Sequence, residues 1–543
     1  MVFCGKPSGG CHACRERKTK CDQVPEGCTQ CKRAKRKCPG YRVPGDLIFR
    51  NESSNVIRKF KAKEAKEKQA ATLKASPPQS VVATGSSSSS PTDDDWDYVS
   101  DGSLEIIQRE DAPLSVFSLA PTIEERATGF FVANFVLGMS GPSKGYLDYL
   151  TEVTRNQLLD EGLLSSMRAV GLAGYAHTVH APSLLKNARY EYYRALKATN
   201  AALRDPEDVK KDTTLLSIMI LGIFETITGS KQSSLKDWAQ HINGAAAVIK
   251  LRGPDQILTP TGRRMMLTVT SSLLITCIYR GVPLPKHMQD YMEDALRLVE
   301  TPDPAFRVLE IMMRFANLRS DVLHKRLTDP QKILSQALAL DGVLLNISSN
   351  PPPGWAYEVI YTDTYSDIVY NGQYHLYYDY WMAQIWNALR TLRIMLNETM
   401  RTVLLAGFSS RPPVFTETQH TAQFQISTDV IYSHQADILY SVPQHLNIFP
   451  EPAGFRDHGI ASIRLHKVME EFAGVRMSGG SFLIWPLWFV GVVDVATDEM
   501  KGFVVRNLKS IAVTMGIQQA AVLAKIVEEQ SEIKEWKDED SVR

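Results

Sequence analysis

Residues 11–38 read CHACRERKTKCDQVPEGCTQCKRAKRKC and contain six of the eight cysteines of this 543-residue chain, together with nine lysines and arginines. The cysteines form two triplets with the same spacing, Cys-x2-Cys-x6-Cys, and the second triplet follows the first by seventeen positions. The triplets are Cys11, Cys14 and Cys21, then Cys28, Cys31 and Cys38. This stretch is therefore a tandem duplication, which suggests pseudo-twofold symmetry.

Clustered cysteines either form disulfides or bind metal, and the rest of the chain favours metal. The N-terminal sequence MVFCGKPSGG lacks the apolar segment of a secretory signal peptide, and there is no run of about 18 apolar residues to cross a membrane. We therefore expect an intracellular chain with no membrane partner, whose thiols stay reduced and bind metal. A disulfide framework and a single four-cysteine zinc site with spare thiols are the alternatives.

The number of cysteines suits two zinc ions. Two tetrahedral ions need twice four ligand positions, and the six thiolates supply them if two, one from each half, bridge both ions. Such a site has no open position for water or substrate, so the zinc is structural. Because the segment is too short for an apolar core, metal binding should supply most of its folding free energy. His12 is interpreted as an exposed loop residue and Cys4 as a free thiol.

Positive charge is concentrated around these cysteines. Residues 1–74 carry 19 lysines and arginines against 7 aspartates and glutamates, a net charge of +12. The whole chain has 61 against 60, so residues 75–543 carry 42 against 53, a net charge of −11. A strongly basic module on a rigid scaffold is typical of nucleic-acid binding. A solvated charge run without a partner is the alternative.

The cysteine spacing, the basic run RERKTK after Cys14 and Pro25 between the halves resemble the fungal binuclear zinc-cluster domain, which binds double-stranded DNA. The resemblance implies that Cys11 and Cys28 bridge the two ions. It also implies two sets of four ligands: Cys11, Cys14, Cys21 and Cys28, and Cys11, Cys28, Cys31 and Cys38.

In that family the helix after the first cysteine pair lies in the major groove and reads a CGG-type triplet. Carried over to this chain, Lys18 and Arg17 would contact guanine edges. Four further cations would contact phosphates: Arg15, Lys20, Lys32 and Lys35. This division agrees with an asymmetry between the halves, because Arg17 has only Ala34 as its counterpart. Each basic run, 15–20 and 32–37, is expected to form about two helical turns.

Residues 41–117 have the composition of a linker. Their lysine-rich first part does not predict a coiled coil, because the heptad positions after Ile57 and Phe60 hold lysine, glutamate or alanine. A homodimer would therefore need a contact elsewhere in the chain. The runs KRAKRK and RKFKAK also suit a nuclear-import signal. Residues 76–92 are rich in serine and proline. Residues 93–111 interleave acidic and apolar side chains, as activation segments that bind coactivators do, with a plain acidic linker as the alternative.

Residues 118–530 are predicted to form a large all-helical domain. Their apolar residues recur with helical periodicity and strand signals are few, while Thr122 and Glu125 have the spacing of a capping box at a helix start. Predicted helical segments are 188–203, 212–229, 238–253 with Gly253 as its C-cap, 386–400 and 484–496. These segments resemble the helical regulatory region that follows the zinc cluster in many fungal transcription factors.

Two features of this region invite other interpretations. His177 and His180 would share a helix face and could hold a metal, but no third ligand is near in sequence, so two ordinary histidines are the preferred interpretation. Cys277 is predicted to be a buried core thiol. No GxSxG, P-loop, dinucleotide-binding or HExxH motif is present, which argues against an enzyme that the zinc module merely anchors.

The sequence thus predicts five parts: a disordered tail (1–10), a binuclear zinc cluster (11–40), a linker (41–117), an all-α regulatory domain (118–530) and a charged tail (531–543). We expect a nuclear, sequence-specific transcription factor for RNA polymerase II that activates a secondary-metabolite gene cluster. The alternatives are a repressor or scaffold that binds DNA, or a regulator of primary or catabolic metabolism.

Overall fold

The computed structural model describes the chain in two separate parts. In the cysteine segment it describes residues 11, 13–14, 17, 19, 21–22, 24, 28–34 and 38. In the helical region it describes residues 121–137, 141–143, 145–156, 160–299, 303–453, 477–531 and 533. The predicted tail 1–10, the linker 41–117 with its basic and acidic segments, and nearly all of the predicted tail 531–543 lie outside the described residues.

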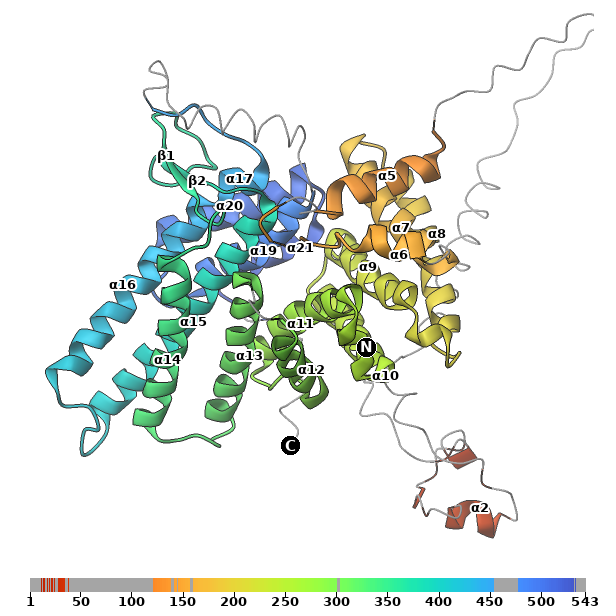
Figure 1. Cartoon of the computed structure of the whole chain (residues 1–543), viewed down its shortest axis with the longest axis horizontal. Coiled ribbons are helices and arrows are strands. Elements are labelled where there is room, and N and C mark those ends of the chain that lie inside the picture. The colour runs from red at the N-terminus through yellow and green to blue at the C-terminus, as the bar shows by residue number, and fades with distance from the viewer. Residues whose placement is uncertain are drawn as a thin grey trace, which may run out of the picture. The chain divides into compact units, whose positions relative to one another are not determined.

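The larger part is built almost entirely of helices (Figure 1). The α-helices are α5 (Ile123–Phe135), α6 (Leu150–Asn156), α7 (Glu161–Thr178), α8 (Leu184–Ala202), α9 (Asp212–Thr228), α10 (Ser233–Arg252), α11 (Pro260–Arg280), α12 (Lys286–Arg297), α13 (Pro304–Leu323), α14 (Pro330–Ser349), α15 (Tyr380–Ser409), α16 (Thr418–Tyr440), α17 (Val442–Leu446), α19 (Met477–Val492), α20 (Asp498–Thr514) and α21 (Gln518–Glu528). Two short 3-10 helices, η1 (Asp208–Lys210) and η2 (Pro254–Leu258), lie between them.

The helices begin and end where the sequence supplies caps. Asp160, Asp303 and Asp379 each accept a hydrogen bond from the backbone N–H three residues further on, which satisfies a free donor of the first turn. Proline is the first residue of α11, α13 and α14, where its missing N–H removes no helical hydrogen bond. Gly253 (φ 80°) and Gly281 (φ 64°) follow the last residues of α10 and α11, in a conformation that favours glycine.

The core of the first helices forms around α9. Residues 213–224 of this helix are all buried, as expected for a helix that is apolar on every face. It packs against α7, α8, α10 and α21. Nearby, α5 and α7 approach so closely that a Cβ atom on Gly171 would lie 1.9 Å from the carbonyl oxygen of Ala127. Glycine at this position therefore sets the distance between the two helices.

The later helices α13, α14, α15 and α16 lie side by side (Figure 1). Arg393 of α15 joins Asp341 of α14 through two hydrogen bonds of 2.8 and 2.9 Å, and both side chains are largely buried. Beside them, α19 contacts α15, α16, α17, α20 and α21, and also α5 near the start of the region. The Met477 N–H donates to Asn134 Oδ1 over 3.0 Å, so residues far apart in sequence close this core.

One short antiparallel ribbon lies between α14 and α15. Its strands, β1 (Glu358–Tyr361) and β2 (Gln373–Leu376), pair Glu358 with Leu376 and Tyr361 with Gln373. Ile360, Tyr374 and Leu376 form a small apolar cluster with Phe449. The sequence did not predict this ribbon, because each strand has only four residues and its buried positions depend on a residue more than seventy positions away.

The predicted helical segments all lie on helices, but α19 ends at Val492, before the end of the predicted segment 484–496. The apolar segment 212–229 is α9, the segment that ends at Gly253 is α10, and α5 begins directly after Thr122. Cys277 is a buried thiol in α11, and burial raises its pKa to about 11. Among the described helices, none combines the length and apolar character that a bilayer crossing requires.

Candidate metal centre

The described residues bring the six cysteine thiols together in two groups of four. Within each group the Sγ atoms all lie within 4.8 Å of one another. The groups are Cys11, Cys14, Cys21 and Cys28, and Cys11, Cys28, Cys31 and Cys38. Cys11 and Cys28 therefore belong to both groups, which is the arrangement that the resemblance implies.

The two halves of the repeat share one backbone hydrogen bond at their Cys-x2-Cys pairs. The N–H of Cys14 donates to the carbonyl oxygen of Cys11, and the N–H of Cys31 donates to that of Cys28, both over 3.1 Å. Each turn brings the second thiol of a Cys-x2-Cys pair next to the first. In the second half the turn continues as α2 (Thr29–Arg33), with Cys28 as its N-cap. The short helix contains Cys31 but ends at Arg33, so it begins and ends earlier than the predicted helix over residues 32–37.

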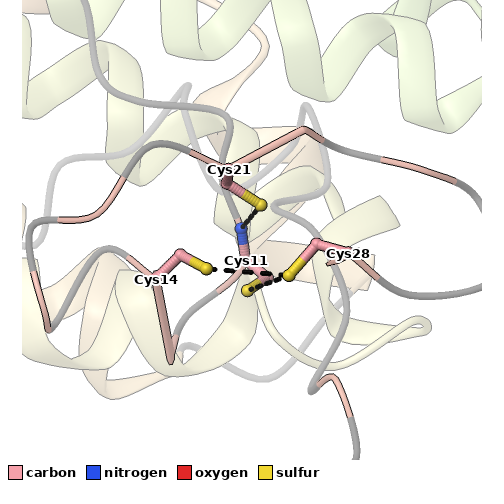
Figure 2. Close-up of side chains that lie close together, drawn as sticks. All are labelled: Cys11, Cys14, Cys21 and Cys28. Carbon is pink, nitrogen blue, oxygen red and sulfur yellow. Dashed lines mark hydrogen bonds between the residues drawn. The ribbon is translucent and has the colours of Figure 1, made fainter. Parts of the chain in front are cut away.

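The distances between the sulfur atoms suit a metal and not a disulfide. Cys28 Sγ lies 3.6 Å from both Cys11 Sγ and Cys14 Sγ (Figure 2). Cys11 Sγ lies 3.7 Å from Cys31 Sγ. A disulfide needs about 2.05 Å. A tetrahedron of thiolates about 2.3 Å from zinc has sulfur–sulfur edges of roughly 3.8 Å. The donor set and its spacing therefore fit zinc.

Burial differs among the six thiols in a way that agrees with sharing. Cys11 and Cys28, which belong to both groups, are fully buried, and Cys14 and Cys31 are 3% exposed. Cys21 and Cys38 are half-buried at the edges of the cluster. Figure 2 shows Cys21 beside Cys11, where the Cys11 N–H donates to Cys21 Sγ over 3.4 Å.

Crowding of the sulfur atoms disfavours thiolates unless a cation binds them. Desolvation raises the pKa of Cys11, Cys14 and Cys28. The hydrogen bond with Cys28, together with desolvation, raises the pKa of Cys31 strongly. A coordinated divalent cation reverses this preference, because a ligating thiol loses its proton. The cluster is therefore a group of donors that a soft divalent cation would stabilise.

A polar contact that the sequence did not predict joins the two halves. The carboxylate of Asp22, next to Cys21, accepts hydrogen bonds from the Thr29 N–H over 3.0 and 3.2 Å and from the Thr29 hydroxyl. The hydroxyl bond is the main reason that the pKa of Asp22 is lowered. The repeat itself could have indicated this contact, because Asp22 and Thr29 each directly follow a cysteine. Their contact fixes the end of the first half against the start of α2.

The predicted DNA-contacting residues are only partly within the described residues. Arg17 and Lys32 are both exposed, as a contact with DNA requires. The other four lie outside the described residues: Arg15, Lys18, Lys20 and Lys35. Their roles stay predictions.

The histidine pair in the helical region does not form a metal site with other described ligands. His177 Nε2 donates to the carbonyl oxygen of Val513 over 2.5 Å, which uses the ring nitrogen to join α7 to α20. The His177 and His180 rings lie 6.5 Å apart between centroids. Among the described residues, the groups of three or more possible ligands are the two cysteine groups alone. His177 is therefore a packing residue.

Comparison with known proteins concerns the larger part. Residues 140–279 match the fungal specific transcription factor domain. This range includes α6 to α10 and nearly all of α11. It does not include the six clustered cysteines of residues 11–38.

Two relatives come from Emericella nidulans. The transcription factor dbaG is 23% identical over 403 residues, which cover 70% of this chain and 86% of that protein. An uncharacterized protein is 31% identical over 94 residues, which cover 17% of this chain and only 20% of the relative. No solved structure matches the chain. The matched domain and dbaG support a fungal transcription factor, a regulator of transcription and not an enzyme.

Proposed function

We propose that this protein is a nuclear, sequence-specific DNA-binding transcription factor that activates transcription by RNA polymerase II. The observation that carries the proposal is the pair of cysteine groups that share Cys11 and Cys28, set in a segment with a net charge of +12. DNA is an array of closely spaced phosphates, so a compact basic module binds it with release of counterions. The match of residues 140–279 supports a regulatory role for the helical region.

Two zinc ions would be held by the six thiols, with Cys11 and Cys28 as shared ligands. When bound, the ions supply structure, because they neutralise thiolates and cross-link two halves that have almost no apolar core. The chain's own residues orient the ligands: the two equivalent turns present Cys14 and Cys31, and the Asp22–Thr29 contact holds the halves together.

Sequence readout is assigned to the first half of the repeat. Lys18 and Arg17 would donate to guanine O6 and N7 of a CGG-type triplet, since these acceptors mark guanine in the major groove. The second-half cations Lys32 and Lys35 would contact phosphates, as would Arg15 and Lys20, and thus add affinity without selecting a sequence.

The remaining parts of the chain receive roles by composition. Residues 93–111 would recruit coactivators, and the basic runs near residues 32–37 and 58–63 would direct nuclear import. The region 118–530 would regulate these activities. Family members that resemble this chain in lacking a coiled coil often control local gene clusters, so we propose a secondary-metabolite cluster as the target. Transcript levels of the genes beside this one, with and without the gene, test that assignment.

Two substitutions test the DNA-reading assignment. Lys18→Ala should weaken binding to the CGG-type site by about 1–3 kcal/mol and relax sequence preference. Lys35→Ala should instead weaken binding to all sequences and lower the salt slope by about one unit. Titrations of full-length protein against matched and scrambled DNA at several salt concentrations distinguish these results. Equal losses on both DNAs for Lys18→Ala would move the base-reading role to another residue.

A repressor is the second candidate for the direction of regulation. A fusion of residues 93–117 to an unrelated DNA-binding domain decides between the two, because an activation segment raises reporter transcription and a plain acidic linker does not.

A further inference from the structure

A cavity of about 340 Å³ lies among the helices of the larger part. It is bordered by residues from α9, α10, α11, α13, α15 and α19. Drug-sized ligands occupy pockets of about 300–1,000 Å³. The volume is therefore in the range of a small organic molecule, and it is far larger than the packing defects of an ordinary protein core.

The cavity is bordered by whole helix faces and not by scattered residues. On α15 Ile385 borders the cavity together with five positions that recur at intervals of three or four residues, the spacing of one helix face: Trp381, Gln384, Ala388, Thr391 and Met395. The positions on either side of this face are mostly buried in the core, whereas these five are half-buried. This face of α15 is therefore packed less completely than the rest of the helix, and the cavity lies beside it.

Aromatic rings form two groups on the cavity wall. Tyr146, Trp381 and Phe482 lie with ring centroids 5.3–6.1 Å apart. Trp485 lies 5.7 Å from Trp238 and 6.0 Å from Tyr279. Aromatic walls favour planar conjugated ligands, which stack on ring faces or meet ring edges.

Several polar side chains that border the cavity lack a hydrogen-bond partner among the described residues. They come from α15 and α19: Trp381 Nε1, Gln384 Oε1, Thr391 Oγ1, Ser478 Oγ and Ser481 Oγ. Buried polar atoms without partners are costly and rare in folded proteins. The set includes an N–H donor, an amide acceptor and three hydroxyl groups that can do either. A ligand with both carbonyl and hydroxyl groups would satisfy them.

The charges at the cavity wall are balanced and already engaged. Arg264 pairs with Asp148 and lies 3.7 Å from Glu152. Asp303 accepts hydrogen bonds from the Ser143 hydroxyl over 2.8 Å and from the backbone N–H of Phe306. Since both charged side chains already have polar partners, the cavity suits an uncharged ligand better than an ionic one.

We propose that this cavity is a binding site for a neutral, planar aromatic compound of about three fused rings that carries carbonyl and hydroxyl groups. Such a compound would stack on the aromatic groups and bond to Gln384, Thr391 and Ser481. The inference concerns the helical region and does not depend on the proposed DNA binding.

The experiment uses 2-hydroxyfluorenone as the probe and fluorene as its apolar counterpart, each titrated into the full-length protein by calorimetry without DNA. Ala388→Phe places a ring inside the cavity and should abolish binding of both compounds. Ala406→Phe makes the same change at an exposed position of the same helix and should leave binding unchanged. Equal binding by both variants, or no binding of either compound by the parent protein, would overturn the proposal.

Two smaller changes keep the test decisive if the Ala388→Phe protein unfolds. Thr391→Val and Gln384→Met keep side-chain size but remove polar groups at the wall. Each should weaken hydroxyfluorenone binding by roughly three- to tenfold, the effect of one lost hydrogen bond, and leave fluorene binding unchanged. Thermal unfolding of every variant checks that the fold is intact. Unchanged hydroxyfluorenone affinity in both variants would show that the polar groups do not face a ligand.

Discussion

The cysteine segment and the helical region achieve order by different means. Among the described residues of the cysteine segment, the buried cluster consists of four cysteines, and Ala13, Cys21 and Cys38 pack against it. In the helical region one apolar core extends from Ala127 to Ile533 and joins nearly every helix. The first part therefore depends on a few ligands that must all be present. The second depends on many contacts, each worth about 1–3 kcal/mol, which can be lost one at a time.

The largest expected effect comes from removing a shared ligand. Cys28→Ser takes one thiolate from both cysteine groups, so the module should lose its zinc and its fold, and sequence-specific DNA binding should disappear. Zinc content, DNA binding and the circular dichroism of residues 1–50 measure this loss.

The matched control is Cys277→Ser, in which the same change is made to a buried thiol of α11. A buried hydroxyl should cost the helical region about 1–3 kcal/mol while zinc content and DNA affinity stay the same. If Cys28→Ser retained zinc and DNA binding, the segment would not be held by shared ligands, and the contrast between the two parts would fail.

The next effect concerns Arg390 of α15, a cation inside the helical region. Arg390 is fully buried, donates to the hydroxyl of Tyr377 over 2.5 Å and lies 3.7 Å from Asp437. It also lies over the rings of Tyr357 and Trp386. Arg390→Ala should destabilise the helical region by about 3–5 kcal/mol, because the ring-lined site loses its cation and Asp437 keeps only its hydrogen bond with His434.

Arg390→Met distinguishes the contribution of the charge to stability from the contribution of the side-chain volume. Methionine restores most of the packing but not the hydrogen bonds, so it should recover part of the loss in chemical denaturation. Equal stability of the alanine variant and the parent would mean that Arg390 contributes nothing to the fold.

A smaller effect is expected where α5 and α7 approach each other closely. Gly171→Ala forces a methyl group against the Ala127 carbonyl, which must move α5 away from α7, at a cost of about 3 kcal/mol. Gly129→Ala is the matched control on α5, since a Cβ there meets nothing within 4 Å. It should stabilise the protein by roughly 0.5–1 kcal/mol, because alanine favours the helix. If a denaturant titration showed that both substitutions change the free energy of unfolding in the same direction, this account of the packing would be contradicted.

The smallest effect is a pH dependence. Burial raises the pKa of Glu225 to about 7, although the Tyr192 hydroxyl donates to its carboxylate over 2.5 Å. In the unfolded chain the group ionises near its ordinary pKa of 4.5. Between about pH 4.5 and 7 the folded state therefore holds a proton that the unfolded state has lost, and stability falls as the pH rises.

Glu225→Gln removes this dependence. The free energy of unfolding of the variant, relative to that of the parent, should rise by about 1–2 kcal/mol between pH 5 and 7 and should not rise further at higher pH. Unfolding titrations of both proteins at several pH values measure the difference between their free energies of unfolding. The contributions of all other titrating groups cancel in this difference. A difference that does not vary with pH would show that Glu225 ionises normally in the folded protein.

The same contrast explains what the sequence could predict. The number of cysteines predicted one shared thiolate from each half, and the resemblance assigned these positions to Cys11 and Cys28, which agrees with the two groups of four. Apolar periodicity and a terminal glycine likewise predicted α9 and the end of α10. Local patterns are sufficient for both.

The remaining features depend on residues that meet only after folding. Arg390 contacts Tyr357, His375 and Asp437, which no spacing rule connects. The ribbon of β1 and β2 is too short for an alternating pattern, and its cover, Phe449, lies far along the chain. The cavity needs the faces of six helices at once. Tertiary contacts of this kind leave no periodic signal in the sequence.

The bond between Asn134 and Met477 has a consequence for the time course of synthesis. The two residues are separated by 343 positions, and α19 packs against α5 at the same place. Translation adds about 5–20 residues per second, so α5 waits roughly 17–70 s before its partner has been made. During that interval Phe131 and Phe135, which are buried in the finished core, have no α19 to complete that core. The helical region must therefore complete its folding after most of the chain has left the ribosome, and the nascent chain is a natural client for chaperones that shield apolar surfaces.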